Sequence, residues 1–439
     1  MNSPLTRWLA RTNRVTFTIF AGAVAFMTYF AMYGFRKPYT AALFAEPVVL
    51  LGRNFTLKSV LVIAQIVGYA LSKFLGIKVL SEMPPGRRAV GLVGLVASSE
   101  LALLLFGIVP GAWKALAIFL NGLPLGMIWG LVFSFLEGRR TSDVLGAILS
   151  ASFILSTGVV KSVGRWVMEQ GVSEGWMPFV VGLIFLPAIG LGAFLLAQLP
   201  PPSREEEALR THRQPMYAAD RSAFYRAFAP GLTAIVLMAM VLTGFRTIRD
   251  DFAAEIWTGL GFSGQEQITL FTLSESLVTP VVLVVLGLMV VIRDDRRAFL
   301  IQMSLMVGGV ALIGLATLLH QIGAIGGLLW MVLIGVGLNV AYIPAGCFLF
   351  DRLIGATRFP GTAVFMIYVT DAFGYASSVG ILLFRELFTP RLEWLTFFIR
   401  FAYAASLIGV IAFGFALAYF ARRTRQPLTA SPAEISEAQ

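Results

Sequence analysis

Residues 15 to 35 read VTFTIFAGAVAFMTYFAMYGF, a stretch that holds no charged side chain. A helix needs about 20 mostly apolar residues to cross the hydrocarbon core of a bilayer, so this stretch predicts a membrane-spanning helix. The whole chain has a similar composition, because 57% of its 439 residues are hydrophobic and 13% are charged. Its mean hydropathy is +0.81. We therefore expect a multi-pass membrane protein rather than a soluble globular one.

Further apolar segments of this length follow along the chain and predict an all-α fold with twelve transmembrane helices. The predicted spans are residues 15–44, 57–82, 88–109, 113–137, 144–167, 176–199, 230–257, 267–292, 298–319, 326–350, 360–385 and 396–421. An even number of spans places both chain ends on the same side of the membrane.

The net charge of +10 follows the predicted loops. Alternate loops and the two tails hold twenty arginines, whereas the loops of the other side hold five Lys or Arg residues. An excess of Lys and Arg marks the cytoplasmic side. We expect a protein of the cell (inner) membrane with both termini in the cytoplasm and the lipid bilayer as its surroundings. The charge is then a topology signal, and no nucleic-acid partner is expected.

Several classes of site are disfavoured by composition. The chain has one cysteine, Cys347, and two histidines, His212 and His320. A histidine-rich metal site and an intramolecular disulfide are excluded, and no phosphate-binding loop or metalloprotease motif occurs. We expect no metal, no cofactor and no enzymatic activity.

Residues 200–229 form the longest polar stretch and separate six predicted spans from six others. Short matches recur in register on the two sides: GFR at 34–36 and 244–246, FLEGR at 135–139 and FLFDR at 348–352, SVG at 162–164 and 378–380. These matches predict a duplicated architecture with an N-terminal six-helix bundle (1–199), a cytoplasmic central loop (200–229) and a C-terminal bundle with a short tail (230–439). In such repeats the substrate site lies at the interface of the halves near the membrane midplane.

Twelve spans, a central loop and a duplicated half resemble the major facilitator superfamily. Three segments resemble its organophosphate:phosphate antiporters: YGFRKPY at 33–39, GYALSKFLGIKVLSE at 68–82 and LNGLPLGMIWG at 120–130. The amino-acid sequence of the first and fourth spans also resembles that of a group of bacterial membrane proteins of unknown function. The antiporter resemblance implies that Arg36, Lys73 and Arg246 contact a phosphate. Its segments add Tyr33, Tyr69, Asn121 and Trp129 as substrate-binding candidates.

Arg36 and Lys37 stand at the end of the first predicted span, where adjacent cations are costly. Snorkelling into the headgroups is one interpretation. A binding role is favoured for Arg36, because a second GFR places Arg246 at the matching position of the other half. A guanidinium offers a planar fork of donors that suits phosphate and carboxylate oxygens. Lys37 points about 100° away on a helix, so both cations cannot face one ligand equally.

Other charged residues lie within predicted spans, and each has two interpretations. Lys73 and Lys161 either line a cationic cavity or, for Lys73, pair with an acid. Arg246 either contacts substrate or pairs with Asp250 four residues later. Acids inside membrane segments serve as proton carriers or as countercharges, and the sequence leaves both roles open. The coupling or countercharge candidates are Glu100, Asp250, Glu275 and Asp371.

These observations favour a secondary transporter that moves a small phosphorylated or carboxylated anion by alternating access, in exchange for phosphate in one version. The two arginines would meet across a central cavity, and the anion would neutralise them as the halves close. The partners would be the small anion, with inorganic phosphate or protons, and the chain would act as a monomer. Within transport, the alternative is a proton-coupled symporter or a drug-type efflux pump. Outside it, the alternative is a non-transporting membrane sensor with a transporter fold.

Overall fold

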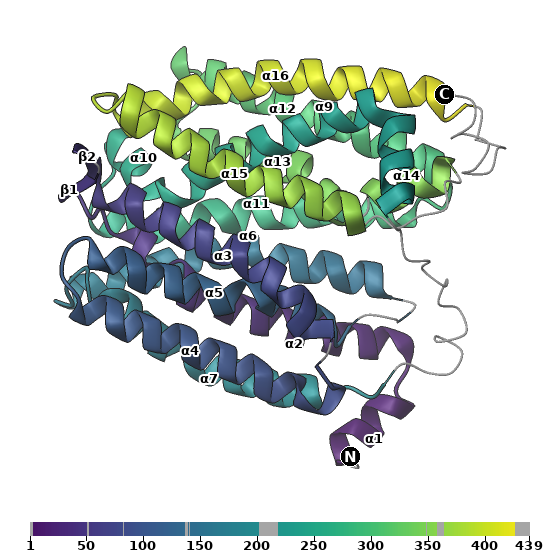
Figure 1. Cartoon of the computed structure of the whole chain (residues 1–439), viewed down its shortest axis with the longest axis horizontal. Coiled ribbons are helices and arrows are strands. Elements are labelled where there is room, and N and C mark those ends of the chain that lie inside the picture. Colours follow the sequence, from purple (N-terminus) through teal and green to yellow (C-terminus); the bar gives the residue numbers. More distant parts are fainter. Residues whose placement is uncertain are drawn as a thin grey trace. The chain divides into compact units, whose positions relative to one another are not determined.

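The computed structural model describes residues 3–50, 52–81, 83–136, 139, 141–201, 218–347, 349–357 and 364–425. The described chain is nearly all helical, with one short hairpin (Figure 1). Its first elements are α1 (Pro4–Arg11), α2 (Arg14–Arg36), η1 (Pro38–Ala41), β1 (Pro47–Leu50), β2 (Arg53–Thr56), α3 (Leu57–Ser81), η2 (Pro85–Arg87), α4 (Arg88–Ile108), α5 (Trp113–Phe133), α6 (Ser142–Glu169) and α7 (Met177–Ala197). The others are α9 (Ala218–Asp251), α10 (Ala253–Gly259), α11 (Gln265–Val291), α12 (Asp295–Gln321), α13 (Gly327–Cys347), α14 (Leu349–Thr357), α15 (Val364–Phe388) and α16 (Trp394–Arg423).

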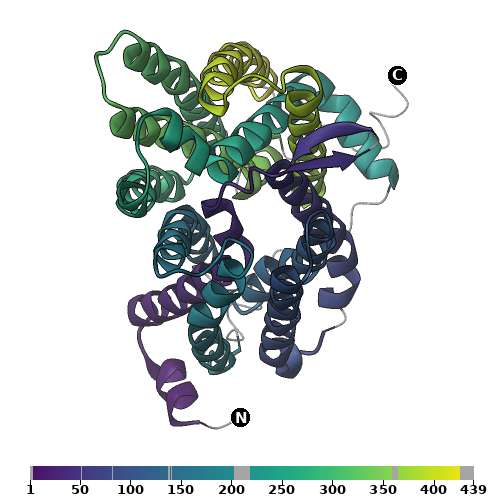
Figure 2. The same ribbon diagram turned by 90° about the vertical axis from the view of Figure 1, so that its left-hand side faces the viewer.

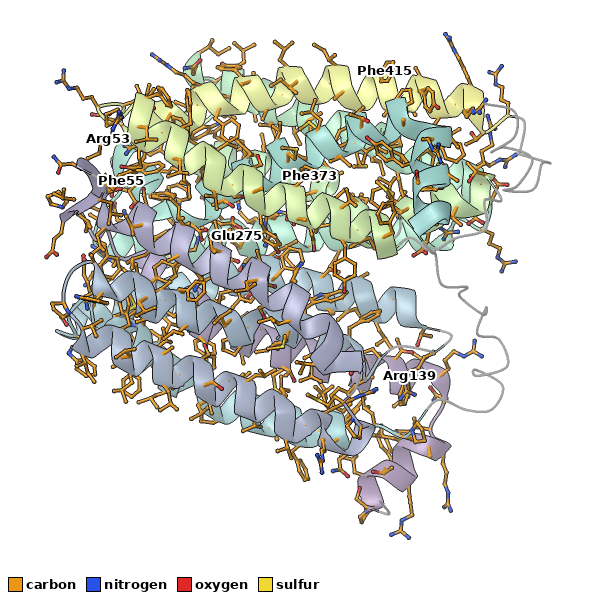
Figure 3. All side chains as sticks on the ribbon, in the orientation of Figure 1. Arg53, Phe55, Arg139, Glu275, Phe373 and Phe415 are labelled. Atoms are coloured by element: carbon orange, nitrogen blue, oxygen red, sulfur yellow. The ribbon has the colours of Figure 1, made fainter. Side chains whose placement is uncertain are left out.

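Eleven helices of the described residues are long and apolar enough to cross a membrane. Each coincides with a predicted span. The remaining predicted span, 57–82, corresponds to α3, which has 25 residues and carries three lysines. Large apolar side chains cover the outer faces of these helices. Phe373 and Phe415, for example, are about half exposed (Figure 3). Surface of this kind is stable against lipid and not against water, so the structure is that of a multi-pass membrane protein.

The end of the first membrane helix depends on Pro38. α2 ends at Arg36, and the amide of Lys37 donates to the carbonyl of Tyr33 as the last helical bond. Pro38 has no N–H to continue the ladder and instead opens the short helix η1. Arg36 and Lys37 are therefore the last helical residue and its cap. The predicted span 15–44 is longer than the helix for this reason.

A β-hairpin follows that the hydropathy pattern does not predict. β1 and β2 pair antiparallel, with Val48 opposite Phe55. Figure 2 looks onto this hairpin, which sits at the start of α3. Residues 47–56 form too short a segment for the periodicity of apolar residues to distinguish a strand from the end of a membrane span.

Contacts divide the chain into two compact units. Unit 1 contains Met1–Arg210, Ile248–Thr279 and Val379–Leu395; unit 2 contains Thr211–Thr247, Pro280–Ser378 and Thr396–Gln439. The last residues of α9, the first half of α11 and the end of α15 thus belong to the same unit as α1 to α7. The division of the chain at 200–229 stays a prediction, and residues 202–217 of that loop lie outside the described part.

Glycines set the closest helix contacts in unit 1, where α3 packs against α5. A Cβ on Gly68 would lie 2.4 Å from the carbonyl oxygen of Phe119, and one on Gly122 would lie 2.8 Å from that of Gln65. Small residues let membrane helices approach backbone to backbone. This packing fixes Tyr69 and Gln65 of α3 against the end of α2.

In unit 2, glycines allow the same close approach between α12 and α13. A Cβ on either Gly309 or Gly337 would lie 2.5 Å from the carbonyl oxygen of the other. α9 enters this unit with a kink at Phe228, two residues before Pro230. The stacked rings of Phe245 and Phe398, 4.9 Å apart, join α9 to α16.

Candidate functional site

Two cationic residues that the sequence predicts to bind substrate lie against the same tyrosine ring in unit 1. The guanidinium carbon of Arg36 lies 3.9 Å from the ring centre of Tyr69, and Lys73 Nζ lies 5.7 Å from the same centre. The ring of Tyr33, one turn before Arg36, is 5.6 Å from the guanidinium carbon. Cations over aromatic faces at these distances are attracted by the ring. The structure thus brings together four of the predicted substrate-binding residues; we name Arg36, Lys73, Tyr33 and Tyr69 the arginine–tyrosine site.

An amide network holds the backbone at this site. Gln65 Nε2 donates to the carbonyl of Arg36 at 2.8 Å and to Asn121 Oδ1 at 3.0 Å. Asn121 Nδ2 donates to the carbonyl of Phe35 at 3.0 Å. Asn121 is fully buried, so its hydrogen bonds fix the end of α2. Gln65 was not among the predicted residues, although a Gln inside an apolar span is a signal of its own.

Trp129, the remaining aromatic candidate, lies two turns beyond Asn121 on α5. Its ring stacks on that of Phe133, with centres 5.0 Å apart and planes 8° apart. The structure gives it this aromatic partner, and its substrate role stays a prediction.

Three further candidates are engaged in buried ion pairs or hydrogen bonds of unit 1. Lys37 pairs with Asp251. Lys161 Nζ donates to the backbone carbonyl of Asp250 at 2.7 Å. Glu275 pairs with Arg249 at 2.8 Å.

Arg249 also contacts Asp250 at 3.3 Å, so one guanidinium faces two carboxylates. The arginine is only 2% exposed. Asp250 and Glu275 thus act here as countercharges of a cation that the sequence reasoning passed over. Arg249 and Asp251 both lie in TGFRTIRDDF (243–252), the stretch that holds the second GFR and Arg246.

A second group of charges surrounds the start of α3. Lys58, 1% exposed, pairs with Glu255 at 2.7 Å and donates to the carbonyl of Thr40 at 3.0 Å. The amide of Thr56 donates to Glu386 Oε2 at 3.2 Å. Hydroxyls of Thr56 and Ser59 donate to Glu386 Oε1 at 2.9 and 2.8 Å. A carboxylate from α15 therefore accepts three hydrogen bonds where β2 meets α3. The first backbone N–H groups of α3, those of Leu57 and Lys58, donate instead to the carbonyls of Glu46 and Phe44.

Glu386 also pairs with Arg385 at 2.8 Å, and the Arg385 guanidinium carbon lies 4.1 Å from the ring centre of Trp394. These contacts, with those above, define the charge set of unit 1, which holds five cations and five acids. The cations are Lys37, Lys58, Lys161, Arg249 and Arg385, and the acids are Asp250, Asp251, Glu255, Glu275 and Glu386. The formal charges of the set cancel.

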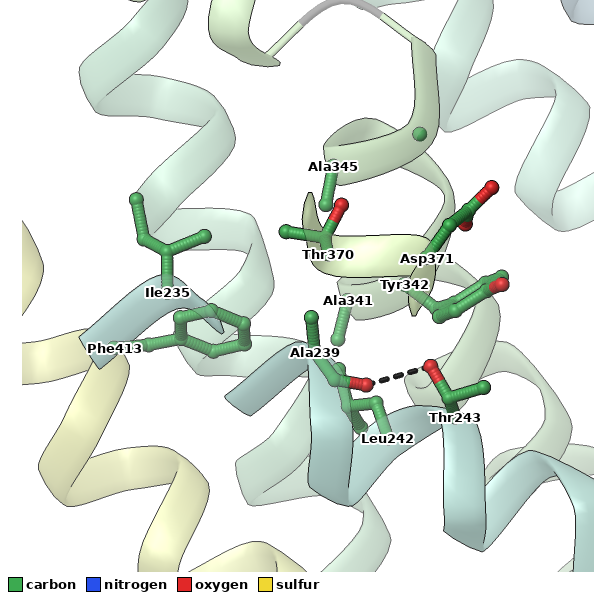
Figure 4. Close-up of a pocket in the computed structure, with 11 residues that line it drawn as sticks. Ile235, Ala239, Leu242, Thr243, Ala341, Tyr342, Ala345, Thr370, Asp371 and Phe413 are labelled. Atoms are coloured by element: carbon green, nitrogen blue, oxygen red, sulfur yellow. Dashed lines mark hydrogen bonds between the residues drawn. The ribbon is translucent and has the colours of Figure 1, made fainter. Parts of the chain in front are cut away.

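Unit 2 contains the other predicted arginine. Arg246 Nη1 donates to the hydroxyl of Tyr342 at 3.4 Å, and the guanidinium carbon lies 5.1 Å from the centre of that ring. Both predicted arginines are therefore paired with tyrosine rings, each inside its own unit. Beside Tyr342 is a pocket that Asp371 and Thr243 also line (Figure 4). The pocket is lined by Ile235, Ala239, Leu242, Thr243, Ala341, Tyr342, Ala345, Gly346, Thr370, Asp371 and Phe413.

Glu100 is the remaining acidic candidate. It lies in the middle of α4 and is 7% exposed. Its carboxyl points at Gly182 of α7, where a Cβ would lie 2.0 Å from Oε2.

No metal-binding group of three or more His, Cys, Asp or Glu residues occurs in the described parts of the chain. In the charge set, four cations pair with acids, and Lys161 donates to a backbone carbonyl. The tyrosine-lined cations and the pocket beside Tyr342 are the features that could hold a small polar ligand.

The fold is similar to that of solved membrane transporters. A D-xylose–proton symporter superposes with a TM-score of 0.63 at 13% identity, over 95% of this chain and 100% of that one. The nucleoside transporter NupG gives 0.59 at 14% identity, over 92% and 99%. A peptide transporter POT gives 0.60 at 13% identity, over 97% and 99%. These are transporters of the major facilitator type, which confirms the predicted fold class.

No curated protein matches the chain in sequence. One family model does match, and its description is a family of unknown function (DUF5690). This agrees with the resemblance to membrane proteins of unknown function. The match covers residues 38–423, nearly the whole chain, and the protein therefore belongs to the DUF5690 family.

Proposed function

We propose that this protein is a secondary transporter for a small phosphorylated or carboxylated anion. The observation that carries the proposal is the arginine–tyrosine site, where Arg36 and Lys73 lie over the same tyrosine ring. Two cations held on aromatic faces present N–H donors in a fixed direction. Guanidinium and ammonium donors bind oxyanions with short, charge-assisted hydrogen bonds.

Arg246 supports the same function from unit 2. It sits at the position that repeats Arg36 in sequence, and it also lies against a tyrosine. Lys37 and Lys161 contribute less to the proposal, because Lys37 pairs with Asp251 and Lys161 donates to a backbone carbonyl. The resemblance of YGFRKPY and GYALSKF to organophosphate antiporters supports a phosphorylated substrate and exchange against phosphate.

The proposal is tested by counterflow in proteoliposomes. Vesicles loaded with unlabelled phosphate, a sugar phosphate or a dicarboxylate receive the labelled anion outside. We expect labelled anion to accumulate transiently in vesicles with protein and not in protein-free vesicles. A neutral sugar and a nucleoside, which match substrates named for the structural neighbours, serve as the comparison. If a neutral solute shows counterflow and none of the anions does, the anion proposal is overturned. The assignment of the transporter fold would be unaffected.

A second candidate is proton-coupled symport, favoured by the position of Asp371. This acid lines the pocket of unit 2 beside Tyr342. If Asp371 carries the coupling proton, Asp371→Asn should abolish accumulation against a gradient and spare counterflow, because exchange needs no net proton movement. Asp351→Asn, at an exposed acid of α14, is the matched control. Unchanged accumulation in Asp371→Asn would remove this acid from coupling.

A further inference from the structure

Glu100 is a buried acid that neither candidate function uses. Within the residues that the structure describes, neither of its carboxyl oxygens has a hydrogen-bond partner. The nearest polar neighbour on its own helix, Ser99, already accepts from Asn121 at 2.6 Å. A buried carboxyl without partners is rare in proteins, because each unsatisfied polar atom costs free energy.

The charged groups of the surrounding helices do not face Glu100. α4 packs against α5, α7, α2 and η2. α7 carries no charged residue at all. The only charged residue of α5 is Lys114, whose Nζ donates to the carbonyl of Phe106 at 2.6 Å, about two turns from Glu100 along α4.

The remaining cations of these elements lie at helix ends. Arg36 of α2 faces the tyrosines of the arginine–tyrosine site, and Arg14 is at the other end of that helix. Arg87 and Arg88 lie at the start of α4, about three turns from Glu100. An ionised carboxylate at Glu100 would therefore be a buried charge without a countercharge, which costs far more than a neutral acid in the same place.

Gly182 gives the carboxyl its space. A Cβ there would come within 2.0 Å of Oε2 and 2.7 Å of Cδ, closer than any real contact. The carboxyl thus fills the gap that glycine leaves on α7. A close fit of this kind leaves no room for a hydration shell, which a carboxylate requires and a carboxylic acid does not.

We propose that Glu100 is a proton-binding site between α4 and α7, occupied by a proton at neutral pH. The ligand is a single proton, and the site is separate from the arginine–tyrosine site. Release of this proton requires that α4 and α7 admit water to the carboxyl. Protonation is therefore linked to the close packing of these two helices, whatever solute the protein moves.

Infrared spectroscopy of the purified protein tests the protonation state directly. We expect a carboxylic-acid C=O band at neutral pH that shifts in D₂O and disappears in Glu100→Gln. Glu169→Gln, at an exposed acid that ends α6, should keep the band. The proposal would be overturned if Glu100→Gln and Glu169→Gln reduced the intensity of the carboxylic-acid band by the same amount. Failure of Glu100→Gln to fold would overturn it too, because an amide of the same shape should replace a neutral acid.

The pH dependence of stability gives a second readout. If Glu100 stays protonated in the folded state, the folded state binds more protons than the unfolded one above the ordinary glutamate range of about 4.3. Stability then falls as pH rises. Relative to Glu100→Gln, the unfolding constant of the wild type should rise up to about tenfold per pH unit. Melting curves from about pH 5 to about pH 8 that run parallel for the two proteins would contradict a bound proton.

Discussion

Replacing Arg249 with glutamine should prevent stable folding of the protein. Arg249 is buried and faces both Glu275, at 2.8 Å, and Asp250, at 3.3 Å. Removing one partner of a buried ion pair costs about 3–5 kcal/mol, because the other charge is left uncompensated. That is a large part of the roughly 5–15 kcal/mol that stabilises a typical domain. We expect the variant to be lost from the membrane fraction or to melt far below the wild type.

A second substitution should restore the balance. Arg249→Gln with Glu275→Gln removes one cation and one acid, so the charge set of unit 1 stays neutral. The double variant should recover most of the folded protein, measured as monodisperse material after extraction in mild detergent. Arg53→Gln, on the exposed hairpin, is the control and should behave like the wild type. A double variant that is no better than Arg249→Gln would show that charge balance is not what Arg249 supplies.

Arg36→Lys should weaken anion binding about tenfold or more. Lysine keeps the charge and loses the planar fork, so a bidentate contact with an oxyanion cannot form. A charged hydrogen bond contributes roughly 1.5–3 kcal/mol, and about 1.4 kcal/mol corresponds to a factor of ten in affinity. Arg246→Lys should show the same loss if the two repeated arginines have equal roles. Binding of the anion that gives counterflow, measured by calorimetry on purified protein, checks both.

The double variant distinguishes one shared ligand from two independent effects. Losses that add in free energy would mean that the arginines act separately, whereas a strong departure from additivity would mean that they act on the same bound anion. Arg53→Lys is the control with the same chemical change at an exposed position. Wild-type affinity in both single variants would show that neither arginine binds through its fork.

Much of the helical architecture was predictable, because a bilayer requires about 20 apolar residues per crossing. The residues at which the spans end were harder to predict. Pro38 ends α2 although apolar residues continue to Phe44, and the hairpin at 47–56 has no hydropathy signal. The lysines of α3 lower its apolar character, yet the helix forms because α5 covers it through paired glycines.

The arginine–tyrosine site was predictable in its members, since Arg36, Lys73 and the tyrosines occur in recognisable segments. The pairing of buried charges was not. Helical spacing offers Asp250 as a partner for Arg246, and this pairing stays a prediction. It does not indicate the contacts of Asp250 with Arg249 and of Arg246 with Tyr342. Contacts between residues separated by many spans, such as Lys37 with Asp251, depend on tertiary packing that no local pattern encodes.

The composition of the charge set has a consequence for biosynthesis. Its cations Lys37, Lys58 and Lys161 are made early, and their acidic neighbours come from the second half of the chain. Asp251 follows Lys37 by 214 residues, a delay on the order of 10 to 40 s at about 5–20 residues per second. Glu386 follows Thr56 by 330 residues. The first helices therefore enter the membrane with lysines still uncompensated, and the ribosome must nearly finish the chain before Thr56 acquires its carboxylate partner.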